Sequence, residues 1–327
     1  MARQAGVSAG TVSNALSGKR QVDPETRLRI EAAVRSLGYV PNVAARALRH
    51  GRSNLIALCS SMPWQIAGGP SQLGFMMEIV AAVSPIALQQ GTAVTLLPPE
   101  ADAGTFLGRI ALDGAIVIEP LREDPFLDVL GRLALPVVTL GRPPSGKWTH
   151  VDLDYPAITH LLCEHLHVSG ARRFPLLTGA EDRIVYDDTI EAYLAFARRI
   201  GMIPEVIRLP EAGGEAAAAA RIRDRIVQRD IDAVLAPIDA FASGVMAAAK
   251  QAGIRVPEEL RVATRHDGFR ARHEYPALTA VDLHLAEAAS QCTRLLLSKI
   301  EGGAVPFRTP ITPPGLVVRG STASGSG

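Results

Sequence analysis

The sequence predicts an α/β protein, in which an all-α headpiece precedes a two-lobed body of doubly wound parallel sheets. Two observations predict this fold class. Residues 1–40 carry short capped helical patterns, whereas from about Ser53 buried apolar runs alternate with helical stretches, and this alternation occurs twice. A chain of 327 residues is long enough for two or three domains. We therefore expect a headpiece over 1–40, a linker over 41–52 and the body over 53–327.

The start of the headpiece predicts a short helix with one bare face. A helical fragment ends at Ala5 and Gly6 turns the chain, so that Ser8 can cap a second helix. An apolar stripe runs through Val12, Ala15 and Leu16. The opposite face carries only small side chains, namely Ala9, Gly10, Ser13, Asn14 and Ser17. This pattern favours a helix-turn-helix, whose second helix enters the major groove of DNA.

The polar side chains of that helix suit DNA contacts. Ser8, Thr11 and Ser13 carry hydroxyl groups for phosphate oxygens, and Asn14 can read a base edge, with adenine as its usual partner. The alternative is a three-helix cap or dimerisation lobe in which these side chains only face solvent. The pattern alone leaves both open.

A third helix is expected between Pro24 and Gly38, because Asp23 can cap its start and glycine commonly ends a helix. Its apolar stripe comprises Leu28 or Ile30, Ala33, Val34 and Leu37. Residues 43–49 then form a helical segment too short to be stable alone. We expect this segment to fold on contact with a partner.

Charge is distributed unevenly along the chain. The whole sequence holds 34 Lys and Arg against 33 Asp and Glu, but residues 1–52 hold nine basic side chains against three acidic ones. Such asymmetry is expected when only the headpiece meets a polyanion. Cys59, Cys163 and Cys292 are too widely spaced for a disulfide framework or a CxxC metal motif, and no apolar run predicts a leader or a membrane span.

The body predicts two similar lobes with a cleft between them. Apolar strand patterns fall in two series, 54–61, 93–99, 114–120 and 136–142, then 173–179, 205–210, 233–239 and 261–266. Helical patterns separate them at 72–90, 124–133, 157–168, 184–200, 214–228 and 240–252. The carboxyl ends of parallel strands converge on one crevice, which is where ligands bind in such folds.

The stretch AGVSAGTVSNALSGKRQVDPETRLRIEAAVRSLGYVPNVAARALRHGRS resembles, nearly position for position, the headpiece of the LacI family of bacterial transcription regulators. The phrases THVDLDYPAITHLLCEHL, VPEELRVA, PALTAVDL and LVVRGSTAS extend the resemblance over the body. The resemblance implies a DNA-binding regulator, a repressor, with a periplasmic-binding-protein-like body that binds a small-molecule effector.

It also implies residue roles. Residues at the places of Ala9, Gly10 and Asn14 face the bases, and those at Ser8, Thr11 and Ser13 hold the DNA backbone. Residues 43–49 would be a hinge helix that pairs with its dimer mate in the minor groove, where the leucine at the place of Leu48 wedges between base pairs. The expected DNA-binding set is Ser8, Ala9, Gly10, Thr11, Ser13, Asn14, Asn42, Ala45 and Leu48.

The implied partners are double-stranded DNA with a palindromic operator, a small-molecule effector of unknown type, and further copies of the chain in a homodimer or tetramer. We expect a cytoplasmic protein that contacts no membrane, needs no cofactor and is not an enzyme. The alternative function is a solute-binding module that has lost DNA binding.

The sequence departs from the family at its effector positions. Where many relatives have an arginine, this chain has Thr189. Where they have an Asn-Asp pair, it has Ile238 and Asp239, and His266 occupies one position of their Gly-aromatic-Asp-Asp phrase. A sugar needs several buried polar partners, because each unpaired hydroxyl costs on the order of 1–3 kcal/mol. An ordinary sugar effector is thus not favoured, and loss of effector binding is a further alternative. We take Thr189, Ile238, Asp239 and His266 as the candidate effector positions.

Several other patterns admit two interpretations. His266 either binds an anionic effector, acts as a pH-sensitive contact, or caps a strand end through backbone hydrogen bonds. Arg183 and Arg265 are either compensating charges in the cleft or members of surface salt bridges.

Patterns that would carry chemistry are weak. The run from His160 to His167 contains metal-ligating side chains, and His160 and Glu164 share a helical face with Cys163 nearby. Because His165 and His167 point elsewhere, no metal site is expected. Asp152 and Asp154 are spaced to share one face of a strand, with no partner acid, and are expected to be a loop or cleft feature. No GxSxG or HExxH motif occurs.

Relatives begin a few residues earlier, and Met1 stands where they carry valine. A GTG codon encodes valine internally and methionine as a start, so we expect the natural start to lie upstream. Intact-mass analysis of the natural protein checks this, because a mass that begins at Met1 or Ala2 would contradict it.

Overall fold

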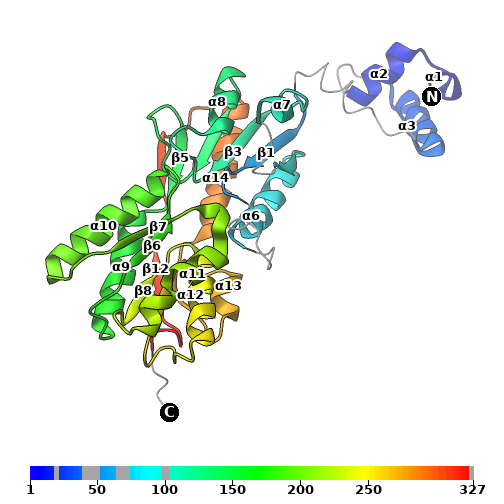
Figure 1. The fold of residues 1–327 in the computed structure, drawn as a ribbon. Coiled ribbons are helices and arrows are strands. Elements are labelled where there is room, and N and C mark those ends of the chain that lie inside the picture. Colours follow the sequence, from blue (N-terminus) through cyan, green and yellow to red (C-terminus); the bar gives the residue numbers. More distant parts are fainter. Residues whose placement is uncertain (18–21, 39–51, 64–73, 98–102, 324–327) are drawn as a thin grey trace. The chain divides into compact units, whose positions relative to one another are not determined.

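Residues 1–17, 22–38, 52–63, 74–97 and 103–323 are described by a computed structural model (Figure 1). The chain divides into two units, Met1–Ser53 and Asn54–Gly327. Each unit has its own hydrophobic core, and each is described separately below.

The headpiece contains three helices, α1 (Ala2–Ala5), α2 (Ala9–Ser17) and α3 (Pro24–Leu37). Gly6 ends α1 with φ of 67°, in the left-handed region that glycine adopts most easily. Two predicted caps are confirmed. The backbone N–H of Thr11 donates to Ser8 Oγ at 3.0 Å, and the N–H of Thr26 donates to Asp23 Oδ2 at 3.0 Å.

The headpiece core is small, so only some residues of the predicted apolar stripes are buried. Its buried members are Ala5, Val12, Ile30 and Ala33. Leu37 was expected on the stripe of α3 but is 50% exposed, and Leu28 is 62% exposed. An α-helix turns by about 200° over two residues, so Leu28 and Ile30 face opposite ways, and Ile30 is the one that reaches the core. The side chain of Leu16 lies outside the described residues.

The first sheet of the body is entirely parallel, with strand order β11-β5-β4-β3-β1-β2. Its strands are β1 (Leu55–Cys59), β2 (Ala93–Leu96), β3 (Gly114–Ile118), β4 (Val137–Leu140), β5 (Thr149–Asp152) and β11 (Arg308–Pro310). The helices of this lobe are α6 (Phe75–Gln89), α7 (Ala103–Leu107), α8 (Pro125–Arg132) and α14 (Leu285–Ile300). Helix α14 packs on α6 and on the centre of the sheet (Figure 1).

The second sheet has strand order β12-β10-β9-β8-β6-β7, and only β12 runs antiparallel to its neighbour. Its strands are β6 (Leu176–Gly179), β7 (Val206–Leu209), β8 (Ala233–Leu235), β9 (Arg261–His266), β10 (Thr279–Asp282) and β12 (Gly315–Val317). The helices of this lobe are α9 (Tyr155–Val168), α10 (Ile184–Ile200), η1 (Glu211–Gly213), α11 (Gly214–Val227), α12 (Asp239–Gln251) and α13 (Phe269–His273). The predicted fold class, two doubly wound halves in one chain, is confirmed.

The chain crosses between the lobes where a strand of one sheet leads into a helix of the other. Asp152 ends β5 and Asp154 caps α9, which packs on the second sheet. Asp282 and His284 repeat this arrangement between β10 and α14. Both Asp154 and His284 have positive φ, and each donates its N–H to the aspartate two residues earlier.

The arrangement confirms a loop feature at Asp154 and corrects one point, the strand face expected to carry both Asp152 and Asp154. They do not share a strand face, because the strand has already ended when the chain reaches the left-handed Asp154. The Asp154 carboxylate caps α9 through the N–H of Ala157, and Asp152 pairs with Arg308 at 2.8 Å.

Cys59, Cys163 and Cys292 are buried free thiols, and burial raises the pKa of each above the ordinary range. Within the described part of the chain, none of the helices combines the length and the apolar character needed to span a bilayer.

The tight packing of the first sheet predicts that Gly114→Ala destabilises the body. A Cβ at Gly114 would lie 2.8 Å from the carbonyl oxygen of Pro136 and 2.9 Å from Leu296 Cδ1. We expect a loss of about 1–3 kcal/mol in the free energy of unfolding, measured by urea denaturation, because overpacking forces neighbours to shift.

Gly315→Ala is the matched control, since it is also a strand glycine and a Cβ there meets nothing within 4 Å. Its effect should stay within about 0.5 kcal/mol. Equal effects of the two substitutions would contradict the packing argument.

Candidate functional site

The first candidate site is the face of α2 that the headpiece core leaves uncovered. Ser8, Ala9 and Gly10 are exposed, while Thr11, Ser13 and Asn14 are half-buried. A Cβ built on Gly10 would contact only Ser8 Oγ, at 3.6 Å. The N-terminal part of α2 therefore offers its backbone to a partner with little side-chain bulk in the way.

The hydroxyl groups at this helix start also hold the helix itself. Ser8 Oγ and Thr11 Oγ1 lie 2.9 Å apart in a hydrogen bond, in addition to the cap that Ser8 makes with the N–H of Thr11. Ser8 thus has a structural role that the sequence analysis assigned in part, as the N-cap. Its contact with a phosphate stays a prediction, as do those of Thr11 and Ser13.

The headpiece carries exposed arginine side chains. Arg3, Arg29 and Arg35 are exposed, and the pair between Arg27 and Glu31, at 3.6 Å, is also exposed. The predicted hinge residues Asn42, Ala45 and Leu48 lie outside the described residues.

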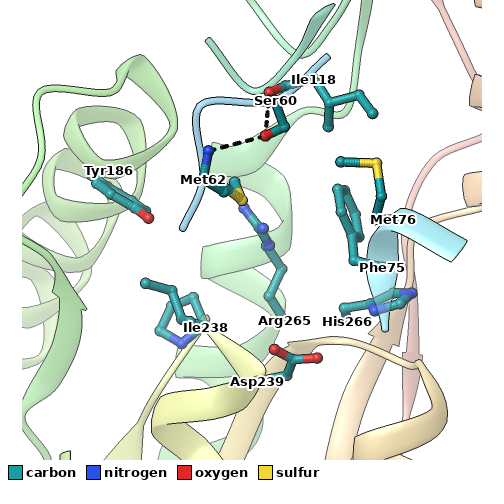
Figure 2. A pocket seen from close by; sticks show the side chains of 11 residues that line it. Ser60, Met62, Phe75, Met76, Ile118, Tyr186, Ile238, Asp239, Arg265 and His266 are labelled. Carbon is teal, nitrogen blue, oxygen red and sulfur yellow. Dashed lines mark hydrogen bonds between the residues drawn. The ribbon is translucent and has the colours of Figure 1, made fainter. Parts of the chain in front are cut away.

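The second candidate site is a small cavity between the two lobes, of about 30 Å³ (Figure 2). It lies at the carboxyl ends of four strands, since Ser60 follows β1, Ile118 ends β3, Ile238 follows β8 and His266 ends β9. Its lining comprises Ser60, Met62, Phe75, Met76, Ile118, Tyr186, Pro237, Ile238, Asp239, Arg265 and His266. This volume is roughly that of one water molecule in the liquid.

Three of the four predicted effector positions line this cavity, namely Ile238, Asp239 and His266. Thr189 does not. Its hydroxyl is buried and donates to the carbonyl of Val185, one turn earlier in α10, at 2.7 Å. Tyr186, which the sequence analysis did not single out, is the residue of α10 that lines the cavity.

His266 contacts the first lobe through its side chain. Its Nε2 lies 3.2 Å from Glu78 Oε2 in α6, and its ring meets the ring of Phe75 edge-on at 5.3 Å between centroids. Its Nδ1 is buried without a hydrogen-bond partner in the described structure. The expected backbone hydrogen bond is therefore not what holds this ring.

Arg265 is buried in the cleft, so the surface salt-bridge interpretation is wrong for this residue. Its Nη1 lies 3.0 Å from Glu119 Oε1 and its Nη2 lies 3.2 Å from Glu119 Oε2. The hydroxyl of Tyr155 donates to Glu119 Oε1 at 2.7 Å. Burial is the largest single influence on Arg265 and lowers its pKa, but the charge of Glu119, the neighbouring Tyr155 and Tyr186 and the hydrogen bond to Glu119 together keep that pKa above the ordinary value.

Arg183 is likewise buried rather than on the surface. Its Nε and Nη2 donate to the two oxygens of Glu211 at 2.6 and 2.9 Å. Its Nη1 reaches into the first lobe, to the carbonyl of Glu119 at 2.6 Å and to Ser61 Oγ at 3.0 Å. Burial and the neighbouring Glu211, which accepts the hydroxyl of Tyr186, raise the pKa of Tyr186 well above its usual range.

Further ion pairs join the lobes at the rim of the cleft. Arg122 of the first lobe pairs with Asp182 and Asp187 of the second, and Arg142 pairs with Asp188. The backbone N–H of Arg122 also donates to the carbonyl of Asp182 at 2.8 Å. Every one of these contacts crosses the cleft.

Sequence reasoning missed Glu119 and Glu211, the acidic partners in the cleft. One signal was available for Glu119, because it follows the wholly buried run GAIVI, where a charged side chain is unusual. No local pattern marks Glu211, whose partner Arg183 lies in a different segment.

The run from His160 to His167 has structural contacts instead of a shared site. His165 Nε2 lies 2.7 Å from Thr322 Oγ1, Glu164 pairs with Arg199, and His160 packs edge-on against Phe196. Among the residues that the structure describes, no group of three potential metal ligands comes together.

Two family models match the chain. Residues 1–42 match the bacterial regulatory proteins of the lacI family, and residues 163–322 match the periplasmic binding protein-like domain. Among curated proteins, the chain is 29% identical over 313 residues to the HTH-type transcriptional regulator CelR of Thermobifida fusca, covering 92% of this chain and 91% of that protein. It is 28% identical to MalR of Streptomyces coelicolor, covering 100% and 96%.

Solved structures agree with this. A CelR–cellobiose complex is similar with a TM-score of 0.72 and 26% identity, covering 98% of each chain. The lac repressor dimer bound to operator and the anti-inducer ONPF has a TM-score of 0.81 and 24% identity, covering 99% of this chain and 98% of the other, and so shows the same fold. With its capped headpiece and two-lobed body, the chain is a member of the LacI family of bacterial transcription regulators, with a DNA-binding helix-turn-helix domain and a periplasmic-binding-protein-like domain.

Proposed function

We propose that this regulator is a repressor that binds a palindromic operator as a homodimer and responds to a small molecule bound between its lobes. The single observation that carries the proposal is the bare, exposed start of α2 in a headpiece that matches the lacI family model over residues 1–42. Relatives include proteins named as a sucrose operon repressor and as catabolite control proteins.

The proposed DNA contacts follow from this face. Ala9 and Gly10 let α2 approach base edges closely, and Asn14 reads a base. Ser8, Thr11 and Ser13 contact the DNA backbone, which fixes the register of the helix in the groove. We extend the proposal to Asn42, Ala45 and Leu48 of the hinge on the family resemblance alone.

The proposed effector site is the cavity at Ile238, Asp239 and His266, and the contribution of Thr189 is indirect, through the packing of α10. One similar structure holds cellobiose and another D-xylulofuranose. Pockets for small molecules typically measure about 300–1,000 Å³. Since the cavity here measures about 30 Å³, an effector of that size enters only when the lobes move apart.

The relatives reported above are transcription regulators. We propose that this chain, too, acts through binding alone, without a catalytic role or a cofactor, and that it works in the cytoplasm where bacterial DNA lies. Movement of the lobes between an open and a closed state would change the spacing of the two paired hinge segments. An effector can shift the equilibrium between these states only if it binds them with different affinities.

Selection of binding sites from random duplexes, followed by a salt titration on the selected site, tests the proposal. We expect a palindromic consensus. We also expect the logarithm of the association constant to fall with the logarithm of salt concentration by roughly 0.9 for each phosphate contacted.

A duplex with the same base composition but a scrambled order is the control, and it should bind far more weakly at every salt concentration. If the selected and scrambled duplexes bind equally weakly, the repressor proposal fails, and the alternative of a solute-binding module that has lost DNA binding is favoured.

The position of Asn14 predicts that Asn14→Ala relaxes base preference more than it weakens binding. Loss of a base-reading contact costs about 1–3 kcal/mol of discrimination at one base pair. Alanine is a better helix former than asparagine, so α2 should remain folded. The measurement is a repeat of the binding-site selection with the variant.

Ser36→Ala is a suitable control, because it also replaces a polar side chain of the headpiece, on α3, whose partner is Gln4 of α1. It should leave the selected consensus unchanged. An identical consensus for Asn14→Ala and the parent would show that Asn14 does not read a base.

A further inference from the structure

Charged side chains of the two lobes contact each other across the cleft, beside the cavity in which an effector would bind. We propose that Glu119, held by Arg265, Tyr155 and Arg183, acts as an internal latch that keeps the two lobes closed, so that any effector must compete with this carboxylate for Arg265. We call these four residues the interlobe latch. The proposal concerns the body alone and goes beyond the proposed function.

Glu119 is a residue of the first lobe whose partners come from the second. It directly follows β3, whereas Arg265 lies in β9 and Arg183 caps α10. Tyr155 opens α9, which packs on the second sheet. The Glu119 carboxylate receives Arg265 and Tyr155, and its carbonyl receives Arg183. Both acceptor groups of this residue, the carboxylate and the carbonyl, are therefore satisfied from across the cleft.

The backbone at Glu119 is unusual in the same place. Its φ is 42°, a left-handed conformation that a residue with a side chain rarely adopts and that persists where surrounding contacts over-determine it. Gly141 makes room for the latch. A Cβ there would lie 3.0 Å from the Tyr155 hydroxyl and 3.5 Å from Glu119 Cγ.

Both charges of the central pair of the latch are buried, so each depends on the other. The side chain of Glu119 is fully buried and that of Arg265 is 9% exposed. While the lobes stay together, loss of either partner would leave the other charge buried and unpaired, which is strongly destabilising. Figure 2 shows Arg265 extending between Ile238 and His266 toward Met62, and all four residues line the cavity.

Contacts at the rim act in the same direction. The pairs of Arg122 and Arg142 with the second lobe, and that of His266 with Glu78, all join the lobes as Glu119 does. These pairs are more exposed and so contribute less than the buried latch. Among these pairs across the cleft, that of Glu119 with Arg265 is the one in which both side chains are buried.

Hydrogen exchange on the full chain tests the latch. The N–H of Arg122 reports closure, because it donates across the cleft to Asp182, and the N–H of Ala115, bonded to Pro136 within the first lobe, reports local stability. In Glu119→Ala we expect the Arg122 amide to exchange roughly tenfold faster or more than in the parent, because one partner of a buried pair is gone. The Ala115 amide should not change.

Glu123→Ala is the matched control, since Glu123 is an exposed glutamate four residues further on. In this variant the Arg122 amide should exchange at the same rate as in the parent. Glu119→Gln keeps the side-chain volume without the charge, and it serves as the second variant if Glu119→Ala does not fold. It too should exchange faster at Arg122.

Adding sodium acetate to the Glu119→Ala variant tests whether the carboxylate itself holds the lobes together. In Glu119→Ala, acetate can place a carboxylate between Arg265 and Tyr155, so it should restore protection of the Arg122 amide, whereas sodium chloride at equal ionic strength should not. Unchanged protection at Arg122 in both folded Glu119 variants would overturn the latch. Faster exchange that acetate does not reverse would overturn the role of the carboxylate charge. Neither readout uses DNA, so failure here is distinguishable from failure of the proposed function.

Discussion

Buried ion pairing across the interlobe cleft is the constraint on which the arrangement of the body depends. Arg183 and Arg265 are both buried among apolar strands, and a buried guanidinium is tolerated only with a well-placed acidic partner. Glu211 holds Arg183 from within its own lobe, while Glu119 holds Arg265 from the other. The second pair therefore ties the geometry of the cleft to the relative position of the two sheets.

The headpiece follows a different physical logic. Its three helices bury few residues, so their ends depend on local caps at Ser8 and Asp23 and on the left-handed glycines Gly6 and Gly38. Such local control leaves the start of α2 free of large side chains without loss of the helix. Small residues would bury little apolar area in a large core. On the exposed start of α2 they instead leave the helix backbone accessible to another molecule.

The candidate effector site differs from its expectation for a physical reason. The family resemblance marked Thr189, Ile238 and His266 as positions that lack the usual polar groups. Of the four candidate positions, Ile238, Asp239 and His266 line the cavity. The strong polar groups of the cleft come instead from Glu119 and Arg265, which lie 146 residues apart in the sequence. No periodicity or motif connects residues at that separation.

The sequence by itself determined the helix caps, the strands with continuous apolar runs, the helix-turn-helix and the alternation that makes two lobes, because these are encoded in residues close along the chain. It did not reveal helix α14 or the edge strands β11 and β12, which join their lobes only after the chain has crossed between them. Tertiary structure alone decided the partners of Arg183 and Arg265 and the volume of the cleft. Those depend on how two separately formed sheets face each other, and that packing brings distant charges within hydrogen-bonding distance.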